Sequence, residues 1–413
     1  MKSIIIDFTV ALRKSSHSVK LALFAMFIIS ISQYAYMTIF NLYLSAGGLN
    51  TALIGGILFM SGIGASIFAF PTGILGDRFG RKKFLVLSSI LIPFIIFIQA
   101  ITLNSKILAI FSLLYGIVTL VIRISIDPFL AENSSSEERV HLFSLLFVIT
   151  NLGGVVGSFF SGEISGLFKT TEFISLRYTL ILFSIFSLIS LFLVLPIKEE
   201  RSKHNDTKVY EKPGPDFIIA FKFAVQSALI GLGAGIIIPF LNLYFKDHFH
   251  LKPGSIGTIF SVGSFFFLFF GLFGPRISKK IGILRGAILY ELLSVPFLII
   301  LGSKPPLVLA IFSFWFRGGL MNAGIPLLST LQMNLISRGR RGTISGFLII
   351  VDNLSRAFGT LIGGFLIDKY GFGLNFYLTA ILYSVSIFYF YRAFKNNKEI
   401  NHGEVVEIKE SGF

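Results

Sequence analysis

One short polar stretch decides the fold, residues 73–83: Gly73-Ile74-Leu75-Gly76-Asp77-Arg78-Phe79-Gly80-Arg81-Lys82-Lys83. It separates two long apolar runs, residues 52–76 and 84–103, which carry hardly any charge. Gly80 permits a tight turn because it has no side chain, and Gly73 permits two helices to approach closely. The stretch therefore predicts a polar hairpin between two apolar helices.

Apolar runs of this kind fill the whole chain. Runs of roughly 18 or more apolar residues can cross a bilayer as helices, and twelve are found, at 21–45, 52–76, 84–103, 107–131, 142–166, 175–196, 217–245, 254–275, 286–303, 309–333, 344–366 and 373–394. Of the 413 residues, 54% are hydrophobic and 14% are charged, whereas a soluble domain carries about a quarter charged residues. We expect an all-α membrane protein with twelve transmembrane helices. The first run is too long for a signal-peptide core, so we expect it to be retained.

The basic residues fall unevenly between these runs. If the N-terminus lies in the cytoplasm, the cytoplasmic segments hold most of the 36 Lys and Arg residues, as the positive-inside rule requires. Both termini are then cytoplasmic, in a multi-pass protein of the cell membrane. The net charge of +15 becomes a topology signal, and nucleic acid is not an expected partner.

The chain divides into two similar halves. Residues 1–197 form an N-terminal six-helix bundle, 198–214 a polar cytoplasmic linker, 215–396 a C-terminal six-helix bundle and 397–413 a cytoplasmic tail. A nearly constant register relates features of the two bundles; it pairs Gly55 with Gly257, Gly80 with Gly282, Gly116 with Gly318, Asn151 with Asn353, Gly157 with Gly359, Gly162 with Gly364, and Asn41-Leu42-Tyr43 with Asn242-Leu243-Tyr244. Two parallel six-helix repeats place a substrate site between the halves, near the midplane.

The stretch 73–83 resembles the signature G-x-L-x-D-R-x-G-R-R/K of the major facilitator superfamily, in the loop where that family carries it. The resemblance implies the fold of that family, with two pseudo-symmetric six-helix bundles, and secondary transport by alternating access. It gives Asp77 a gating contact with the N-terminus of the eleventh helix, where a helix dipole favours a carboxylate. It also implies that the basic residues pair with an acid at the end of the fourth helix, for which Glu132 is the candidate. The gating set is Gly73, Asp77, Arg78, Gly80, Arg81, Lys82 and Glu132.

Two other stretches depart from the family pattern. In the second half, Lys279 stands at the position equivalent to Asp77, so the two halves should gate unequally. Residues 153–162 partly resemble the antiporter signature of the family, but Ser158 and Ser161 replace its Pro and one Gly. Small residues four apart also pack helices together, and we favour that interpretation. The partial likeness alone favours export as the direction of transport.

Several ionisable residues lie within the apolar runs. A charge near mid-bilayer costs about 3 kcal/mol, so it usually faces a cavity or a partner. Arg123 with Asp127, and Asp352 with Arg356, are each four residues apart and lie on one helix face. These pairs could line the substrate and proton path, as could Arg317, or they could neutralise one another and assist packing. Glu291 is less expected in the path.

Polar residues in the runs complete the candidate path. We predict the set rather than any one member, because each could instead form an interhelical hydrogen bond. With the charged candidates, the predicted path comprises Asp352, Arg356, Arg317, Arg123, Asp127, Asn151, Asn353, Gln33, Tyr34, Tyr36, Asn41, Asn242, Tyr244 and Asn322.

Signals for enzymes and cofactors are lacking in the sequence. No Gly-rich phosphate loop followed by Lys and Ser or Thr is found, Cys is absent, and the six His are scattered without metal spacing. We expect no enzymatic activity, no cofactor and no metal.

The expected function is proton-coupled transport of a small organic solute by a monomer in the lipid bilayer, with export favoured. The alternatives are uptake of a sugar or organic anion, with Arg317 and Arg356 as anion clamps, and a sensor that retains the fold without transport.

Overall fold

The computed structural model describes residues 15–199, 216–337 and 340–395, and the side chains at 70–79, 136–137, 140 and 273–280 lie outside this description. The predicted linker and tail fall mostly outside these residues, so the domain boundaries stay predictions. The described part contains helices without any strand, which confirms the expected all-α class.

The described residues of the first half form seven helices. They are α2 (His17–Ala46), α3 (Thr51–Phe79), α4 (Arg81–Ile101), α5 (Ser105–Glu132), α6 (Ser136–Leu167), α7 (Glu172–Ser187) and α8 (Ile189–Val194). The helix starts follow local sequence: Ser16 and Asn104 cap α2 and α5 with their side-chain oxygens, and Ser135 forms a capping box with Glu138 at α6.

The second half repeats this arrangement. It contains α9 (Asp216–Ile237), the 3-10 turn η1 (Ile238–Phe240), α10 (Leu241–Phe249), α11 (Pro253–Ile281), α12 (Ile283–Gly302), α13 (Leu307–Ala323), α14 (Ile325–Leu335), α15 (Arg341–Tyr370) and α16 (Phe372–Phe394). Pro239 and Pro326 stand at the breaks after α9 and α13, since proline cannot donate a helical hydrogen bond.

Twelve candidate membrane spans emerge from the described residues, as predicted. Three of them combine shorter pieces: α7 with α8, α9 with η1 and α10, and α13 with α14. Large apolar side chains such as Ile110, Phe192 and Phe221 are well exposed on the protein. In water such a surface would be costly, whereas lipid accommodates it. The chain is therefore a multi-pass membrane protein.

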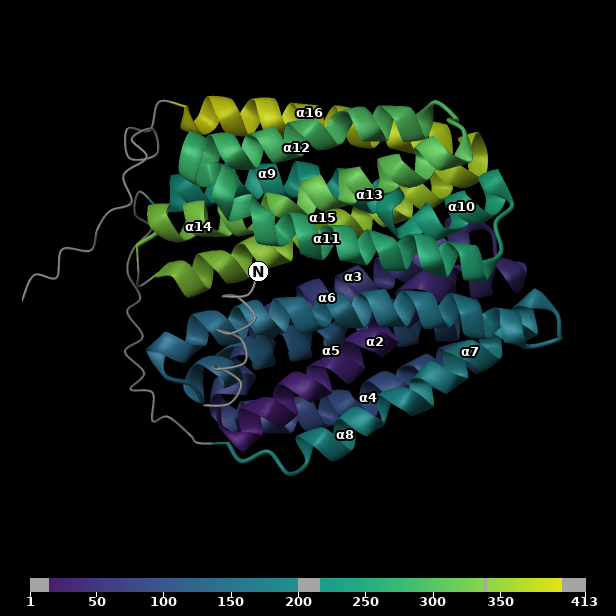
Figure 1. The fold of residues 1–413 in the computed structure, drawn as a ribbon, viewed down its shortest axis with the longest axis horizontal. Coiled ribbons are helices and arrows are strands. Elements are labelled where there is room, and N and C mark those ends of the chain that lie inside the picture. Colours follow the sequence, from purple (N-terminus) through teal and green to yellow (C-terminus); the bar gives the residue numbers. More distant parts are fainter. Residues whose placement is uncertain (1–14, 200–215, 338–339, 396–413) are drawn as a thin grey trace, which may run out of the picture.

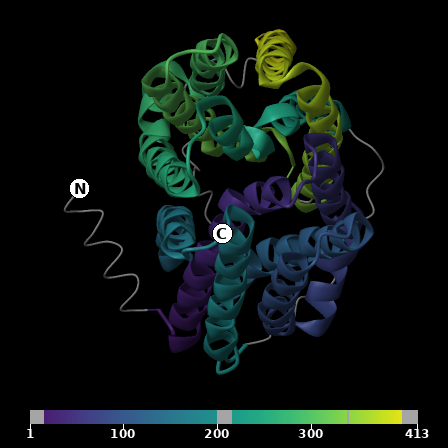
Figure 2. The same cartoon turned by 90° about the vertical axis from the view of Figure 1, so that its right-hand side faces the viewer.

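The two halves stand side by side, with all the long helices running along one direction (Figure 1). Helix α2 begins and α16 ends at the left of Figure 1; we call this end the terminal face and the other end the opposite face. Figure 2, viewed from the opposite face, shows the first half below and the second half above. The halves meet where α3 packs against α15 and α6 against α11.

Glycines permit this close contact between halves. A Cβ on Gly55 would lie 3.0 Å from the Cα of Gly364, and one on Gly162 would lie 2.9 Å from the Cα of Gly257. These are the residues that the internal repeat relates, Gly55 to Gly257 and Gly162 to Gly364. The two contacts are therefore equivalent by the pseudo-two-fold symmetry, and they lie toward the opposite face.

Candidate functional site

An asparagine clasp joins the halves near the opposite face. Asn41 Nδ2 of α2 donates to the carbonyl oxygen of Pro239 at 2.6 Å, and Asn242 Nδ2 of α10 donates to that of Thr38 at 2.9 Å. Each asparagine thus binds the carbonyl three residues before the other asparagine. Both side chains are buried, where an unpaired amide is costly. The repeated Asn-Leu-Tyr sequence therefore forms a symmetric contact between the halves.

The tyrosines of the same repeat fix the clasp within each half. Tyr43 donates its hydroxyl to the Ala100 carbonyl at 2.7 Å, and Tyr244 donates to the Leu301 carbonyl at 3.1 Å. Both rings are buried. Each tyrosine ties its helix to a neighbouring helix of its own half, so the clasp is held on rigid supports. Tyr244, a predicted path residue, is thus buried and has a structural contact in this conformation.

Two polar contacts lie beyond the clasp, at the rim of the opposite face. Lys246 of α10 forms an ion pair of 2.8 Å with Glu172 of α7. Asn50 before α3 donates to Asp368 of α15 at 3.1 Å. Both link one half to the other. The clasp, the glycine contacts and this rim close the protein at the opposite face.

Removing the clasp should favour separation of the halves at this face. In Asn41→Ala with Asn242→Ala, two hydrogen bonds of about 1 kcal/mol each are lost, so the equilibrium should shift about thirtyfold away from the closed state. Because the chain contains no Cys, the change can be measured by oxidative cross-linking of Asn50→Cys with Asp368→Cys.

With Asn50→Cys and Asp368→Cys present, the protein that also carries Asn41→Ala and Asn242→Ala should cross-link more slowly than the protein that keeps both asparagines. Tyr43→Phe serves as the control, since it removes a bond of similar depth within one half and should leave the rate unchanged. Equal rates in all backgrounds would show that the clasp does not hold the face closed.

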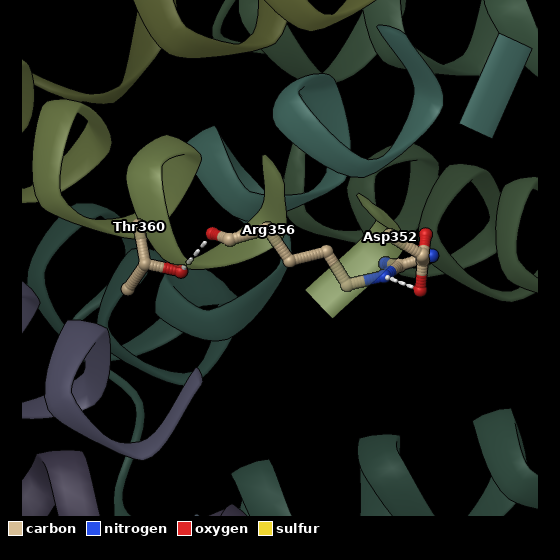
Figure 3. Close-up of polar contacts among 3 residues, drawn as sticks. All are labelled: Asp352, Arg356 and Thr360. Atoms are coloured by element: carbon tan, nitrogen blue, oxygen red, sulfur yellow. Dashed lines mark hydrogen bonds and ion pairs between the residues drawn. The ribbon is translucent and has the colours of Figure 1, made fainter. Parts of the chain in front are cut away.

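A second feature lies at mid-helix in α15. Arg356 Nε donates to Asp352 Oδ2 at 2.8 Å, and the Arg356 carbonyl accepts from the Thr360 hydroxyl (Figure 3). The side chains are 45% and 34% exposed, respectively, although α15 is packed between α3 and α9. A partly exposed ion pair at this depth requires either water or a polar ligand nearby. The predicted intrahelical pair is thus formed.

The other predicted pair, on α5 of the first half, behaves differently. Arg123 and Asp127 lie on α5 and both are exposed, but the residues that the structure describes include no ion pair between them. Of the two predicted pairs on one helix face, whose four residues the structure describes, Asp352 and Arg356 thus form an ion pair in this conformation and Arg123 and Asp127 do not.

Arg317 and Glu291 lie inside the second half. Arg317 on α13 is 4% exposed, and Glu291 on α12 is 1% exposed. Glu291 Oε1 accepts from Gln226 Nε2 of α9 at 3.0 Å. Tyr383 of α16 lies within electrostatic range of both residues and of the Asp352–Arg356 pair. Arg317 is thus sealed within one bundle here, unlike Arg356.

The remaining polar candidates separate into two groups. Tyr36 donates to Gln99 inside the first half, while Asn151 and Asn322 donate to carbonyls one turn earlier in their own helices. These three have intramolecular partners. Gln33, Tyr34 and Asn353 are partly exposed, and the Tyr34 ring lies next to Gly154 of α6. The second group stays the better candidate for a solute path.

The polar hairpin 73–83 is described only in part. Gly80 has φ +90° and Gly282 has φ +87°, and each precedes a helix. Both positions favour glycine, which agrees with the predicted turn. The side chains of Asp77 and Arg78, and the surroundings of Gly73, lie outside the described side chains, so the gating contacts stay predictions. Glu132 lines a hollow of about 530 Å³ at the terminal face.

Glu199, which the sequence did not single out as a site residue, contacts this hairpin. The Glu199 carboxylate accepts from the backbone N–H groups of Arg81 and, at 3.3 Å, of Lys82. These are orphan donors at the start of α4, where negative charge is also favoured by the helix dipole. Only the position of Glu199 at the start of the predicted polar linker could have suggested this contact.

Replacing Glu199 should destabilise the first half modestly. Glu199→Ala removes a charged N-terminal cap from α4, which should cost about 1 kcal/mol. Chemical unfolding in detergent measures the change. Lys198→Ala is the control, because Lys198 contacts Ser18 through its backbone N–H, which alanine retains; an equal loss in both variants would contradict the capping role.

Comparison with known proteins agrees with this geometry. The family model of the Major Facilitator Superfamily matches residues 22–226 and 223–409. The chain therefore belongs to the Major Facilitator Superfamily, which confirms the resemblance noted in residues 73–83. No protein of curated function matches the sequence significantly.

Solved structures share the fold at low identity. A bacterial homologue of the human lysosomal transporter Spinster, in an inward-facing and occupied conformation, has TM-score 0.75 and 13% identity, over 91% of this chain and 96% of that one. The nucleoside transporter NupG has TM-score 0.74 and 16% identity over 92% and 100%. A D-xylose-proton symporter has TM-score 0.71 and 14% identity over 94% and 97%.

Proposed function

We propose that the chain is a secondary active transporter of a small organic solute, which works by alternating access and is coupled to protons. One observation carries the proposal: two repeat-related halves are closed at one face by contacts that obey their pseudo-symmetry, while an ion pair at mid-helix stays partly exposed. Symmetric contacts at one face can be exchanged for contacts at the other as the halves rock.

The proposed orientation follows from charge. Helix α2 begins and α16 ends at the terminal face, and the predicted basic segments adjoin the helix ends there, so we take this face to be cytoplasmic by the positive-inside rule. The structure then corresponds to a state closed to the outside. Export remains our preferred direction, on the partial signature at 153–162. The glycines of this stretch also lie against a neighbouring helix, since a Cβ on Gly157 would lie 2.2 Å from the Ile31 carbonyl oxygen. This contact supports a packing role for residues 153–162.

Uptake of an organic anion is the second candidate. Arg356 is partly exposed and its Nε alone is bound to Asp352, so the rest of the guanidinium can meet a carboxylate or phosphate of a solute. Arg317 is sealed away, which leaves Arg356 as the cation that such a solute would reach.

Counterflow in proteoliposomes tests the proposal. Vesicles loaded with an unlabelled solute should accumulate the labelled form of the same solute; uridine, D-xylose and benzoate represent nucleosides, sugars and organic anions. Runs at two pH values and in both vesicle orientations report proton coupling and direction. Binding of a solute without exchange would favour the sensor.

Loss of Asp77 should block this exchange. Asp77→Asn removes the carboxylate that the family resemblance assigns to gating, so exchange should fall about tenfold or more if one charged contact is lost. Undiminished counterflow in Asp77→Asn would contradict the gating role, whereas Asp368→Asn, a rim carboxylate, should retain most of the exchange.

A further inference from the structure

The second half contains a buried carboxyl that the proposed solute path does not use. Glu291 is 1% exposed, and its Oε1 accepts one hydrogen bond from Gln226. Its Oε2 is buried and has no hydrogen-bond partner. A carboxylate with one unpartnered oxygen in such a place is far more costly than a neutral carboxyl.

No cation among the described residues forms an ion pair with this carboxyl. The helices packed against α12 are α16, α13, α14 and α11, with Gln226 reaching it from α9. Of these, α14 contains no titratable residue, and the described side chains of α11 contain none. The titratable groups facing the region are Tyr383 from α16 and Arg317 from α13, and Glu291 forms no ion pair with the described residues.

Arg317, in the same bundle, also has a buried nitrogen without a hydrogen-bond partner among the described residues. Its side chain is 4% exposed and its Nε has no partner. Tyr383 is fully buried and lies within electrostatic range of Glu291, Arg317, Arg356 and Asp352. Glu291 and the partly exposed ion pair of α15 thus share Tyr383 as a neighbour, and a change of charge at Glu291 changes the electrostatic potential in this region.

We propose that Glu291 is the group that binds the transported proton, with Oε2 carrying it in this closed state. On release the carboxyl becomes a carboxylate, the proton passes to water, and the net charge of the cluster falls by one. The change alters the electrostatic balance around Arg356, where a solute would bind. This inference rests on the proposed proton-coupled transport and names its proton site.

Infrared difference spectroscopy of the purified protein in lipid tests the proton site without any solute. The wild type should show a carbonyl stretch of a protonated carboxyl that disappears as the pH rises. The band should shift when the protein carries ¹³C-labelled Glu, and it should be missing in Glu291→Gln, which preserves shape and the hydrogen bond to Gln226. Asp352→Asn is the matched control and should retain the band.

Other outcomes overturn the inference. A wild type without a titrating carboxyl band refutes it, as does a band that ignores the ¹³C-Glu label, and neither result depends on whether a variant folds. A band unchanged in Glu291→Gln also refutes it.

Flux then separates the inference from the proposed function. If the wild type exchanges uridine, D-xylose or benzoate, Glu291→Gln should still exchange that solute but lose its accumulation by a pH gradient. Unchanged gradient-driven accumulation would refute Glu291 as the coupling site and leave transport established. A titrating Glu291 in a protein without any exchange would refute transport, and with it the role of Glu291 in coupling, and would leave only a protonated carboxyl at Glu291.

Discussion

Solute exchange should be lost when both members of the α15 ion pair are neutralised, even though the protein stays folded. Asp352→Asn with Arg356→Gln leaves no unpaired charge within the helix, so its cost in stability should be small. If Arg356 holds the solute by a charge-assisted hydrogen bond, its loss should lower exchange about tenfold to about a hundredfold. Counterflow with the solute that the wild type exchanges measures the effect.

The single substitutions distinguish a transport role from mere neutralisation. Arg356→Gln leaves Asp352 without its partner in the membrane, at a cost of about 3 kcal/mol, so it should unfold more readily than the double variant. If the pair only neutralises itself, the double variant should transport at the wild-type rate. That outcome would remove Arg356 from the solute site.

The rim ion pair provides a matched control for this experiment. Lys246→Gln with Glu172→Gln removes the same two charge types across an equal distance of 2.8 Å. An ion pair near the surface contributes about 0–1 kcal/mol, so exchange should change only a few-fold. A similar loss in both double variants would indicate a general effect of charge removal.

The architecture could be predicted from the sequence because the signals for it, apolar runs and short repeated motifs, are each visible in a short stretch of sequence. The twelve spans follow from apolar length, and the repeat from glycines and from Asn-Leu-Tyr. Sequence reasoning also proposed that Asn41 and Asn242 could be either path residues or hydrogen-bonding groups; the structure shows them as the clasp. Which of these roles an asparagine has depends on which backbone carbonyls, about two hundred residues away in the sequence, lie within hydrogen-bonding distance of its side chain.

Other site details could not be predicted for the same reason. Arg317 and Arg356 look alike in sequence, since each lies near the centre of a span, yet one is sealed and the other is partly exposed. Burial depends on how the helix is rotated against its neighbours, and the apolar sequence around both residues leaves that rotation undetermined. Glu199 likewise reaches α4 only because the chain folds back after α8.

The largest loss of stability should come from Gly116→Ala, at the crossing of α5 and α3. A Cβ on Gly116 would lie 1.8 Å from the Ser61 carbonyl oxygen, and one on Gly64 would lie 2.1 Å from that of Leu113. Backbone atoms cannot swing aside as a side chain can, so the helices must separate. We expect a loss of about 3 kcal/mol or more, at the upper end of what overpacking costs.

Two further glycines show why the nature of the neighbour matters more than the glycine itself. Gly56 lies on α3 with nothing within 4 Å of its added Cβ, so Gly56→Ala should stabilise by about 0.5–1 kcal/mol through helix propensity. For Gly318, the repeat mate of Gly116, the three heavy atoms nearest to an added Cβ all belong to the Phe267 ring, the closest at 2.2 Å. Because a ring can rotate away, Gly318→Ala should cost less than Gly116→Ala. Unfolding of the three variants in one detergent gives the order, and equal stability of Gly116→Ala and Gly56→Ala would mean that α3 and α5 do not cross as closely as described.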